Sequence, residues 1–212
     1  MIDNIEVFKQ NHIRIKSGEK EIHIDPFQTD TASNSADFIL ITHDHFDHFS
    51  IKDIENTAKN DTVLIVPENM CKKAEAAREY VKKIVTVKPC GSYNVDGLEF
   101  ETVPAYNVGK PFHPKSAGWV GYILKIDGKR IYVAGDTDTT KEAMAVNCDI
   151  ALVPVGGTYT MNAKQAAKLI NTIKPEIAVP VHYGGVVGKE KDGIDFQKSV
   201  DKSIKVVLKI KF

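Results

Sequence analysis

Cysteine is scarce in this sequence, which has three in 212 residues. Cys71, Cys90 and Cys148 lie far apart, and an odd, sparse set argues against a disulfide framework. No pair of them has the spacing of a zinc knuckle. We therefore expect each cysteine to pack as a small buried apolar residue.

Long hydrophobic runs are also missing. No apolar stretch approaches the ~20 residues needed to span a bilayer, so the sequence predicts no membrane-spanning helix. The N-terminus carries Asp3 and Glu6 and shows no basic patch followed by an apolar core, so we see no signal peptide. From these features we expect a soluble, cytoplasmic protein.

Neither sign of charge is in excess, because 28 Lys and Arg residues balance 28 Asp and Glu residues. With a formal net charge of zero, no global field attracts nucleic acid or an anionic membrane, and a small molecule is the expected partner. The length and the lack of any linker-like segment predict a single domain over residues 1–212. The oligomeric state is left open, a homo-oligomer included.

Two hydrophobic periodicities alternate along the chain, which predicts a mixed α/β fold. Short apolar or alternating runs indicate β-strands, with hairpin turns at 17–18 and 127–128. Apolar residues at helical spacing indicate helices, as between Met70 and Val81. The expected strands are 13–15, 22–24, 38–41, 62–66, 84–87, 98–103, 122–126, 130–134, 150–153, 177–181 and 204–210, and the expected helices are 50–59, 67–81, 139–145, 163–170 and 194–200.

The most informative segment is Thr42-His43-Asp44-His45-Phe46-Asp47-His48, which holds three of the seven histidines. It follows the predicted strand 38–41, so it is a loop at the C-terminal end of a strand, where α/β proteins collect ligands. A lone histidine in such a loop is usually a solvated polar residue, but three imidazoles with interleaved carboxylates have little structural use. Imidazole nitrogens and carboxylate oxygens suit zinc, manganese or iron, and the segment therefore predicts a metal site.

The spacing within this loop divides its residues into sets. His43 and His45 are two apart in an extended chain and can point toward one ion. Asp47 and His48 come after a turn and can face a second ion beside the first. Asp44 then points the other way, and we expect it to form hydrogen bonds within the loop rather than bind metal.

The motif His43-x-His45-x-Asp47-His48 after an apolar strand resembles the signature of the metallo-β-lactamase superfamily. Further matches follow in the order expected for that superfamily: His113, then Asp136 after Tyr132-Val133-Ala134-Gly135, then His182 in Pro180-Val181-His182-Tyr183-Gly184. Within the superfamily, residues 105–107 and 153–161 resemble the branch that contains L-ascorbate-6-phosphate lactonase and many metal-dependent hydrolases.

The resemblance implies a four-layer α/β/β/α sandwich with two divalent metal ions, zinc or manganese, at one edge between two mixed sheets. In the implied assignment, the first ion is bound by His43, His45 and His113, the second by Asp47, His48 and His182, and Asp136 bridges both. His113 has the alternative of facing the substrate, because its Pro-Phe-His-Pro setting departs from the usual one. The two remaining histidines, His12 and His23, are expected to be surface or hydrogen-bonded strand residues.

The chemistry expected of this arrangement follows from two cations side by side. They lower the pKa of bound water toward ~7, so a metal-bridging hydroxide exists at neutral pH. Asp47 can orient that hydroxide and pass a proton to the leaving group. The predicted function is a dinuclear metal-dependent hydrolase acting on a small ester, lactone or phosphodiester. An iron-binding redox member of the same superfamily is the alternative, although members that reduce oxygen carry a carboxylate at the position of His45.

Other residues around the site have more than one interpretation. Asp25 either accepts a hydrogen bond from a ligand imidazole or is a turn aspartate before proline. The Gly156–Thr160 segment either holds an anion on its backbone N–H groups or leads into a helix capped by Thr160 or Asn162. By position alone, three residues are candidates for substrate binding: Asn107, Tyr159 and Tyr183.

Overall fold

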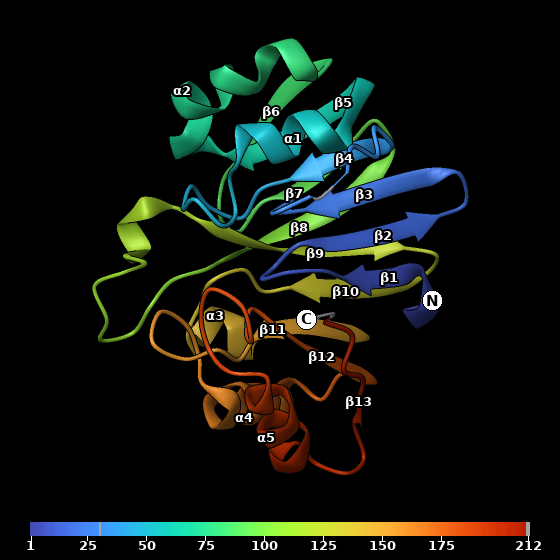
Figure 1. Ribbon diagram of the computed structural model, residues 1–212. Helices are drawn as coiled ribbons and strands as arrows, with labels where there is room; N and C mark the ends of the chain where they lie inside the picture. The colour runs from blue at the N-terminus through green and yellow to red at the C-terminus, as the bar shows by residue number, and fades with distance from the viewer. Residues whose placement is uncertain (30, 211–212) are drawn as a thin grey trace.

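The fold contains two β-sheets. Figure 1 shows the computed structural model of the chain, which describes residues 1–29 and 31–210. The first sheet has six strands in the order β1 (Ile5–Val7), β2 (Ile13–Ser17), β3 (Lys20–Ile24), β4 (Ala36–Leu40), β5 (Ala58–Pro67) and β6 (Lys83–Val87). Strands β1 to β3 are antiparallel, as the predicted first hairpin requires, and β3 to β6 are parallel.

The second sheet is built from strands that follow β6 in the chain. Its seven strands have the order β13 (Lys205–Val206), β12 (Ile177–Val181), β11 (Ile150–Pro154), β10 (Lys129–Val133), β9 (Val120–Ile126), β8 (Leu98–Pro104) and β7 (Ser92–Val95). Strands β7 to β10 are antiparallel neighbours and β10 to β13 are parallel. Both sheets are therefore mixed.

Helices cover the outer face of each sheet, as Figure 1 shows. Over the first sheet lie α1 (Ile51–Thr57) and α2 (Cys71–Ala74), whose apolar residues pack with the outward-facing residues of β4 and β5. Over the second sheet lie α3 (Lys141–Met144), α4 (Ala163–Ile173) and α5 (Lys191–Ser199). The architecture is thus the predicted α/β/β/α sandwich.

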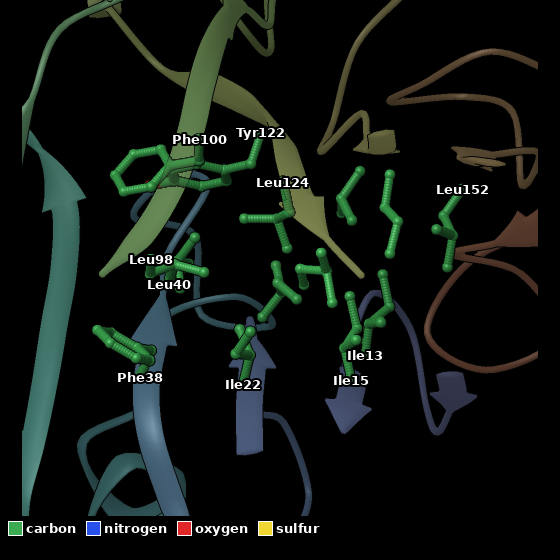
Figure 2. Close-up of a cluster of buried hydrophobic side chains, with 14 of the residues drawn as sticks. Ile13, Ile15, Ile22, Phe38, Leu40, Leu98, Phe100, Tyr122, Leu124 and Leu152 are labelled. Atoms are coloured by element: carbon green, nitrogen blue, oxygen red, sulfur yellow. The ribbon is translucent and has the colours of Figure 1, made fainter. Parts of the chain in front are cut away.

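The main core lies between the two sheets. Alternate residues of each strand point inward, so Ile13, Ile22 and Phe38 of the first sheet face Phe100 and Tyr122 of the second (Figure 2). All five side chains are at most 3% exposed. This apolar layer fixes how the two sheets stack, and hence how the loops at their shared edge meet.

Two helices begin at the polar residues expected to cap them. The Ser50 side chain accepts a hydrogen bond from the backbone N–H of Asp53 at the start of α1. At the start of α4, Asn162 and Gln165 form a reciprocal capping box, so Asn162 rather than Thr160 is the cap. Short 3₁₀ helices complete the fold at Ile2–Asn4, Glu68–Met70, Glu75–Tyr80 and Lys115–Ala117.

Several expectations about local structure were wrong in part. The helix predicted over 67–81 is a single α-helical turn between two 3₁₀ segments, although Met70, Ala74, Ala77 and Val81 do share one buried face. Strands β1 and β7 were not predicted. The strand predicted over 204–210 is reduced to β13, because Pro180 of β12 has no N–H with which to continue the ladder.

The cysteines also differ from expectation. Cys148 is buried beside α3, but Cys71 and Cys90 are exposed. Cys71 starts α2 on its solvent side, and Cys90 lies in the turn before β7 with a left-handed backbone conformation. No helix within residues 1–29 and 31–210 has the length and apolar character needed to cross a membrane.

Candidate metal centre

The predicted ligands come from loops that leave the same edge of the two sheets. His43 to His48 follow β4, Asp136 follows β10 and His182 follows β12. His113 lies in the long connection between β8 and β9. Because the carboxyl ends of parallel neighbours meet at one edge of a sheet, segments far apart in sequence converge there.

The first group of side chains is His43, His45 and His113. One ring nitrogen of each lies within 4.8 Å of the others, which is close enough for all three to bind one ion. His43 and His113 are buried, whereas His45 is partly exposed. The three rings also surround Trp119, with ring centroids 5.0–5.5 Å from the indole.

The second group is Asp47, His48 and His182. Nε2 of His182 lies 3.4 Å from Oδ2 of Asp47, and Nε2 of His48 lies 3.7 Å from the same oxygen. The two imidazole nitrogens are 3.1 Å apart. All three side chains are buried.

Asp136 stands between the two groups. Its Oδ2 lies 3.3 Å from Nε2 of His113 and 3.9 Å from Nε2 of His43. Its Oδ1 lies 3.4 Å from Nε2 of His48 and 3.3 Å from Nε2 of His182. Each carboxylate oxygen therefore faces one group, which is the geometry of a bridging ligand.

These separations fit metal ligands better than hydrogen bonds. Most exceed the ~2.7–3.2 Å of a good N–H···O bond. Ligand atoms around a tetrahedral zinc ion with bonds of ~2.0–2.1 Å are about 3.4 Å apart. Among the described residues, Nε2 of His43, Nε2 of His113 and Oδ1 of Asp136 are buried without a hydrogen-bond partner. Unpartnered buried polar atoms on both sides of the Asp136 carboxylate fit the binding of cations there.

Proton affinities in the cluster reflect burial and the crowding of charges. Burial, together with the neighbouring His48, holds the pKa of His43 well below its usual range, so its imidazole is neutral with a free lone pair. Burial opposes ionisation of Asp136, but the imidazoles of His182 and His48 hold its pKa well below the usual range. Burial lowers the pKa of His48 as well, yet the carboxylates of Asp136 and Asp25 raise it to about 9. A cation bound at that imidazole competes with its proton.

Asp25 is the buried carboxylate that orients His48. Its Oδ2 lies 2.7 Å from Nδ1 of His48 and also accepts hydrogen bonds from the Thr42 hydroxyl and the Asn11 amide. Its Oδ1 accepts the backbone N–H of Thr42 at 2.7 Å. With its Nδ1 proton directed at Asp25, His48 presents Nε2 to the cluster. Of the two readings of Asp25, the geometry supports the hydrogen-bond acceptor.

Asn107 has the same relation to His113. Its Oδ1 lies 3.0 Å from Nδ1 of His113 and accepts the backbone N–H of that residue at 3.1 Å. Its amide nitrogen donates to the backbone oxygen of Tyr159. Asn107 therefore fixes His113 with Nε2 toward Asp136, which favours the ligand interpretation of His113 over the substrate-facing one.

Gln10 is a site residue that sequence reasoning missed. It is 1% exposed, and its amide nitrogen donates to Oδ2 of Asp47 at 3.0 Å. Its Oε1 accepts the backbone N–H of Val186, and its backbone oxygen accepts the N–H of His182. Gln10 thus ties Asp47 to the loop after β12. Gln10 belongs to no motif in the sequence. The only available signal is a polar residue next to a short apolar strand.

The backbone around the cluster is strained at three non-glycine residues. Gln10, Asp25 and His182 have φ values of 56°, 45° and 57°, in the left-handed region. Each such residue costs of the order of 1–3 kcal/mol and persists only where its surroundings enforce it. Gln10 contacts Asp47, Asp25 contacts His48, and His182 is itself part of the cluster. The strained residues are therefore those that orient the side chains of the cluster.

Asp44 is directed away from the cluster, as the loop spacing predicts, but its partner lies outside the loop in which we expected it to form hydrogen bonds. The Asp44 carboxylate pairs with Lys73 at 3.0 Å on the protein surface. Phe46 is 68% exposed and lies at the rim of a cavity.

A cavity of 360 Å³ opens onto the cluster. Cluster residues form its floor, and Phe46, Phe112, Tyr159, Val186 and Val187 form its walls. Of the three candidate substrate-binding residues, Tyr159 lines this cavity. Asn107 instead supports His113, and Tyr183 is 2% exposed and packs in the core beneath α5.

A family model for the beta-lactamase superfamily domain matches residues 4–182. The chain belongs to the metallo-β-lactamase superfamily. It is 36% identical over 206 residues to a UPF0173 metal-dependent hydrolase of Thermococcus onnurineus, covering 91% of this chain and 90% of that protein. It is 37% identical over 205 residues to one from Pyrococcus abyssi, covering 90% and 89%. The protein is a metal-dependent hydrolase of this superfamily.

Solved structures agree with this fold. A crystal structure of a candidate metal-dependent hydrolase from Parabacteroides distasonis superposes with a TM-score of 0.83 at 33% identity, covering 97% of this chain and 91% of that one. Igni18, a metallo hydrolase from Ignicoccus hospitalis, superposes with a TM-score of 0.79 at 23% identity, covering 96% and 93%. The latter likeness concerns the fold alone.

Proposed function

We propose that this metal-dependent hydrolase uses two divalent cations, zinc or manganese, to hydrolyse a small ester, lactone or phosphodiester. His43, His45 and His113 hold one ion, and Asp47, His48 and His182 hold the other. The observation that carries the proposal is Asp136, whose two oxygens face the two groups, each 3.3 Å from the nearest imidazole nitrogen of its group. A donor set of imidazoles and carboxylates suits both metals.

When bound, two such cations supply a hydroxide nucleophile at neutral pH and polarise the scissile group. Asp47 is suited to handle the proton of this reaction. Its carboxylate belongs to the second group and also lines the cavity, so it faces both ligands and substrate. Gln10 and His182 both contact its Oδ2. Burial alone would raise the pKa of Asp47, but these two contacts and the neighbouring His48 hold that pKa below its usual range. Asp47 therefore begins the reaction as an ionised acceptor.

The test is a hydrolysis screen of zinc- and manganese-loaded protein on lactones, carboxylic esters, phosphodiesters and thioesters. In Asp47→Ala we expect turnover of any accepted substrate to fall by at least ~10²–10⁴-fold, because a ligand and a proton acceptor are lost together. Near-wild-type turnover in this variant would show that the wrong carboxylate has been assigned.

The matched control is Asp44→Ala, three residues away in the same loop. Its carboxylate pairs with Lys73 at the surface rather than with a side chain of the cluster. We expect turnover and metal content close to wild type, since an exposed ion pair contributes little to stability. Equal damage from both variants would mean that the loop as a whole, and not Asp47, is responsible.

A further inference from the structure

The walls of the cavity above the cluster are apolar and aromatic. Phe112 and Tyr159 are each 40% exposed and meet edge to face, with ring centroids 4.7 Å apart. Phe46, from the loop after β4, lines the same cavity, and its ring centroid lies 6.1 Å from that of Phe27. Large apolar side chains that stay exposed around a pocket mark a site that binds an apolar group.

Cationic side chains are absent from the part of this cavity that the described residues line. Three lysines of the surrounding loops pair with carboxylates: Lys73 with Asp44, Lys110 with Asp138, and Lys115 with Glu142, at 2.7–3.0 Å. Lys110 also donates to the backbone oxygen of Thr160. Each of the three already has an anionic partner, and none of them lines the cavity.

A lysine occurs instead in a neighbouring cavity of 530 Å³, whose lining includes Lys9 and Glu190. This cavity shares Val186 with the one above the cluster, and Gln10 lines it. Its two charges are of opposite sign, so it offers no net attraction for an anion. The metal ligands His45, Asp47, Asp136 and His182 line only the apolar cavity.

Building on the proposed function, we propose that the substrate carries an uncharged apolar group held between Phe46, Phe112 and Tyr159, and no anionic group beyond the scissile one. The cavity volume of 360 Å³ lies near the lower limit of small-molecule sites, ~300–1,000 Å³. The favoured substrates are therefore small esters or lactones with a short alkyl or aryl substituent. Phosphorylated sugars and other compounds with a second anionic group are rejected.

Three p-nitrophenyl esters that share one leaving group test this. In zinc-loaded wild type we expect kcat/KM to rise from acetate to butyrate by up to about fourfold per added methylene, as burial of a CH₂ predicts. The mono-p-nitrophenyl ester of succinic acid, which ends the same chain in a carboxylate, should be at least about tenfold poorer than butyrate. A succinate ester that equals or exceeds butyrate would overturn the inference.

Variants of Phe112 assign the effect to the cavity wall. Phe112→Ser should remove the gain from acetate to butyrate, and Phe112→Lys should reverse the preference toward the succinate ester. Val108→Ser is the matched control, because Val108 is an exposed apolar residue of the same loop that does not line the cavity. If Val108→Ser and Phe112→Ser change the butyrate-to-acetate ratio of kcat/KM equally, the cavity wall does not select the substrate.

Calorimetry with butyrophenone, an uncharged aryl ketone that is not hydrolysed, separates this inference from the proposed function. We expect Phe112→Ser to weaken its binding about tenfold and Val108→Ser to leave it unchanged. Unchanged binding in Phe112→Ser would overturn the inference. If no ester, lactone or phosphodiester is hydrolysed at all, the proposed function fails, while the butyrophenone result still decides the inference.

Discussion

Replacing Asp25 by Asn should weaken metal binding without any change to a proposed ligand. The Asp25 carboxylate is fully buried and receives four donors. Oδ2 meets His48 Nδ1, the Thr42 hydroxyl and the Asn11 amide at 2.6–2.7 Å, and Oδ1 accepts the Thr42 backbone N–H at 2.7 Å. An amide at this position must place its NH₂ group against at least one of these donors.

The magnitude follows from that count. The less costly orientation sets the NH₂ against the Thr42 backbone N–H, which leaves a buried donor unpaired at about 1–3 kcal/mol. The remaining contacts survive but lose the negative charge that strengthens them. Because this carboxylate directs Nε2 of His48 into the cluster, we expect metal affinity in Asp25→Asn to fall by about 10–100-fold.

The assay is competition for zinc against a chelator of known affinity, with thermal melts of the metal-free protein alongside. Asp53→Asn is the control, since Asp53 is also buried and accepts two hydrogen bonds from Thr29 but contacts no residue of the cluster. It should lose stability and keep its zinc affinity. Wild-type zinc affinity in Asp25→Asn, or an equal loss in both variants, would refute the role given to Asp25.

Two further predictions concern stability. Burial, with a contribution from the neighbouring His23, lowers the pKa of His12 to about 3. In the unfolded state the pKa is about 6.5, so the unfolded chain binds a proton at a pH where the folded protein does not. Stability is therefore fully present above pH 6.5 and is lost as pH falls toward 3; at pH 5 the loss from His12 is about 2 kcal/mol. His12→Phe should reduce the drop in urea-unfolding free energy between pH 7 and pH 5 by that amount, and an unchanged drop would contradict this. Gly121→Ala places a Cβ 2.6 Å from the backbone oxygen of Ala134 and 2.8 Å from that of Val133, so we expect a loss of about 1–3 kcal/mol. A wild-type melting temperature would show that the two strands can separate freely.

The proposed ligands could be predicted from the sequence because they follow strands. The 42–48 loop, Asp136 and His182 each come directly after a short apolar run, and parallel strands bring such positions to one edge. The family resemblance supplied the pairing of the two sheets, which no local pattern contains. Hydrophobic alternation predicted the first hairpin, and the isoleucines of β2 and β3 form part of the core between the sheets.

The supporting residues were harder to predict, because their roles depend on tertiary contacts. Tyr183 follows a ligand in sequence, but the left-handed backbone of His182 redirects the chain and the tyrosine enters the core beside Gly193. Asn107 was expected at the substrate and instead holds His113. Gln10 contacts Asp47 across 37 positions of sequence, a distance at which no local pattern carries information.

The histidines of the first hairpin illustrate the same limit. His12 and His23 were expected to be surface or hydrogen-bonded strand residues, and both are buried. Their ring nitrogens are 3.1 Å apart, and Nε2 of His23 lies 2.8 Å from Glu21. The hydrogen-bonded alternative was therefore the correct one, with His23 in β3 and His12 directly before β2. The sequence predicted the hairpin that brings the two rings together, but it did not decide whether they are buried.

The central claim, that seven side chains hold two cations, is tested most directly by counting bound metal. Zinc titration of metal-free protein followed by calorimetry should give two equivalents per chain in wild type. His182→Ala should give one tight equivalent, because only the second group contains His182. A single equivalent in wild type, or two equally tight equivalents in His182→Ala, would contradict the two-ion arrangement around Asp136.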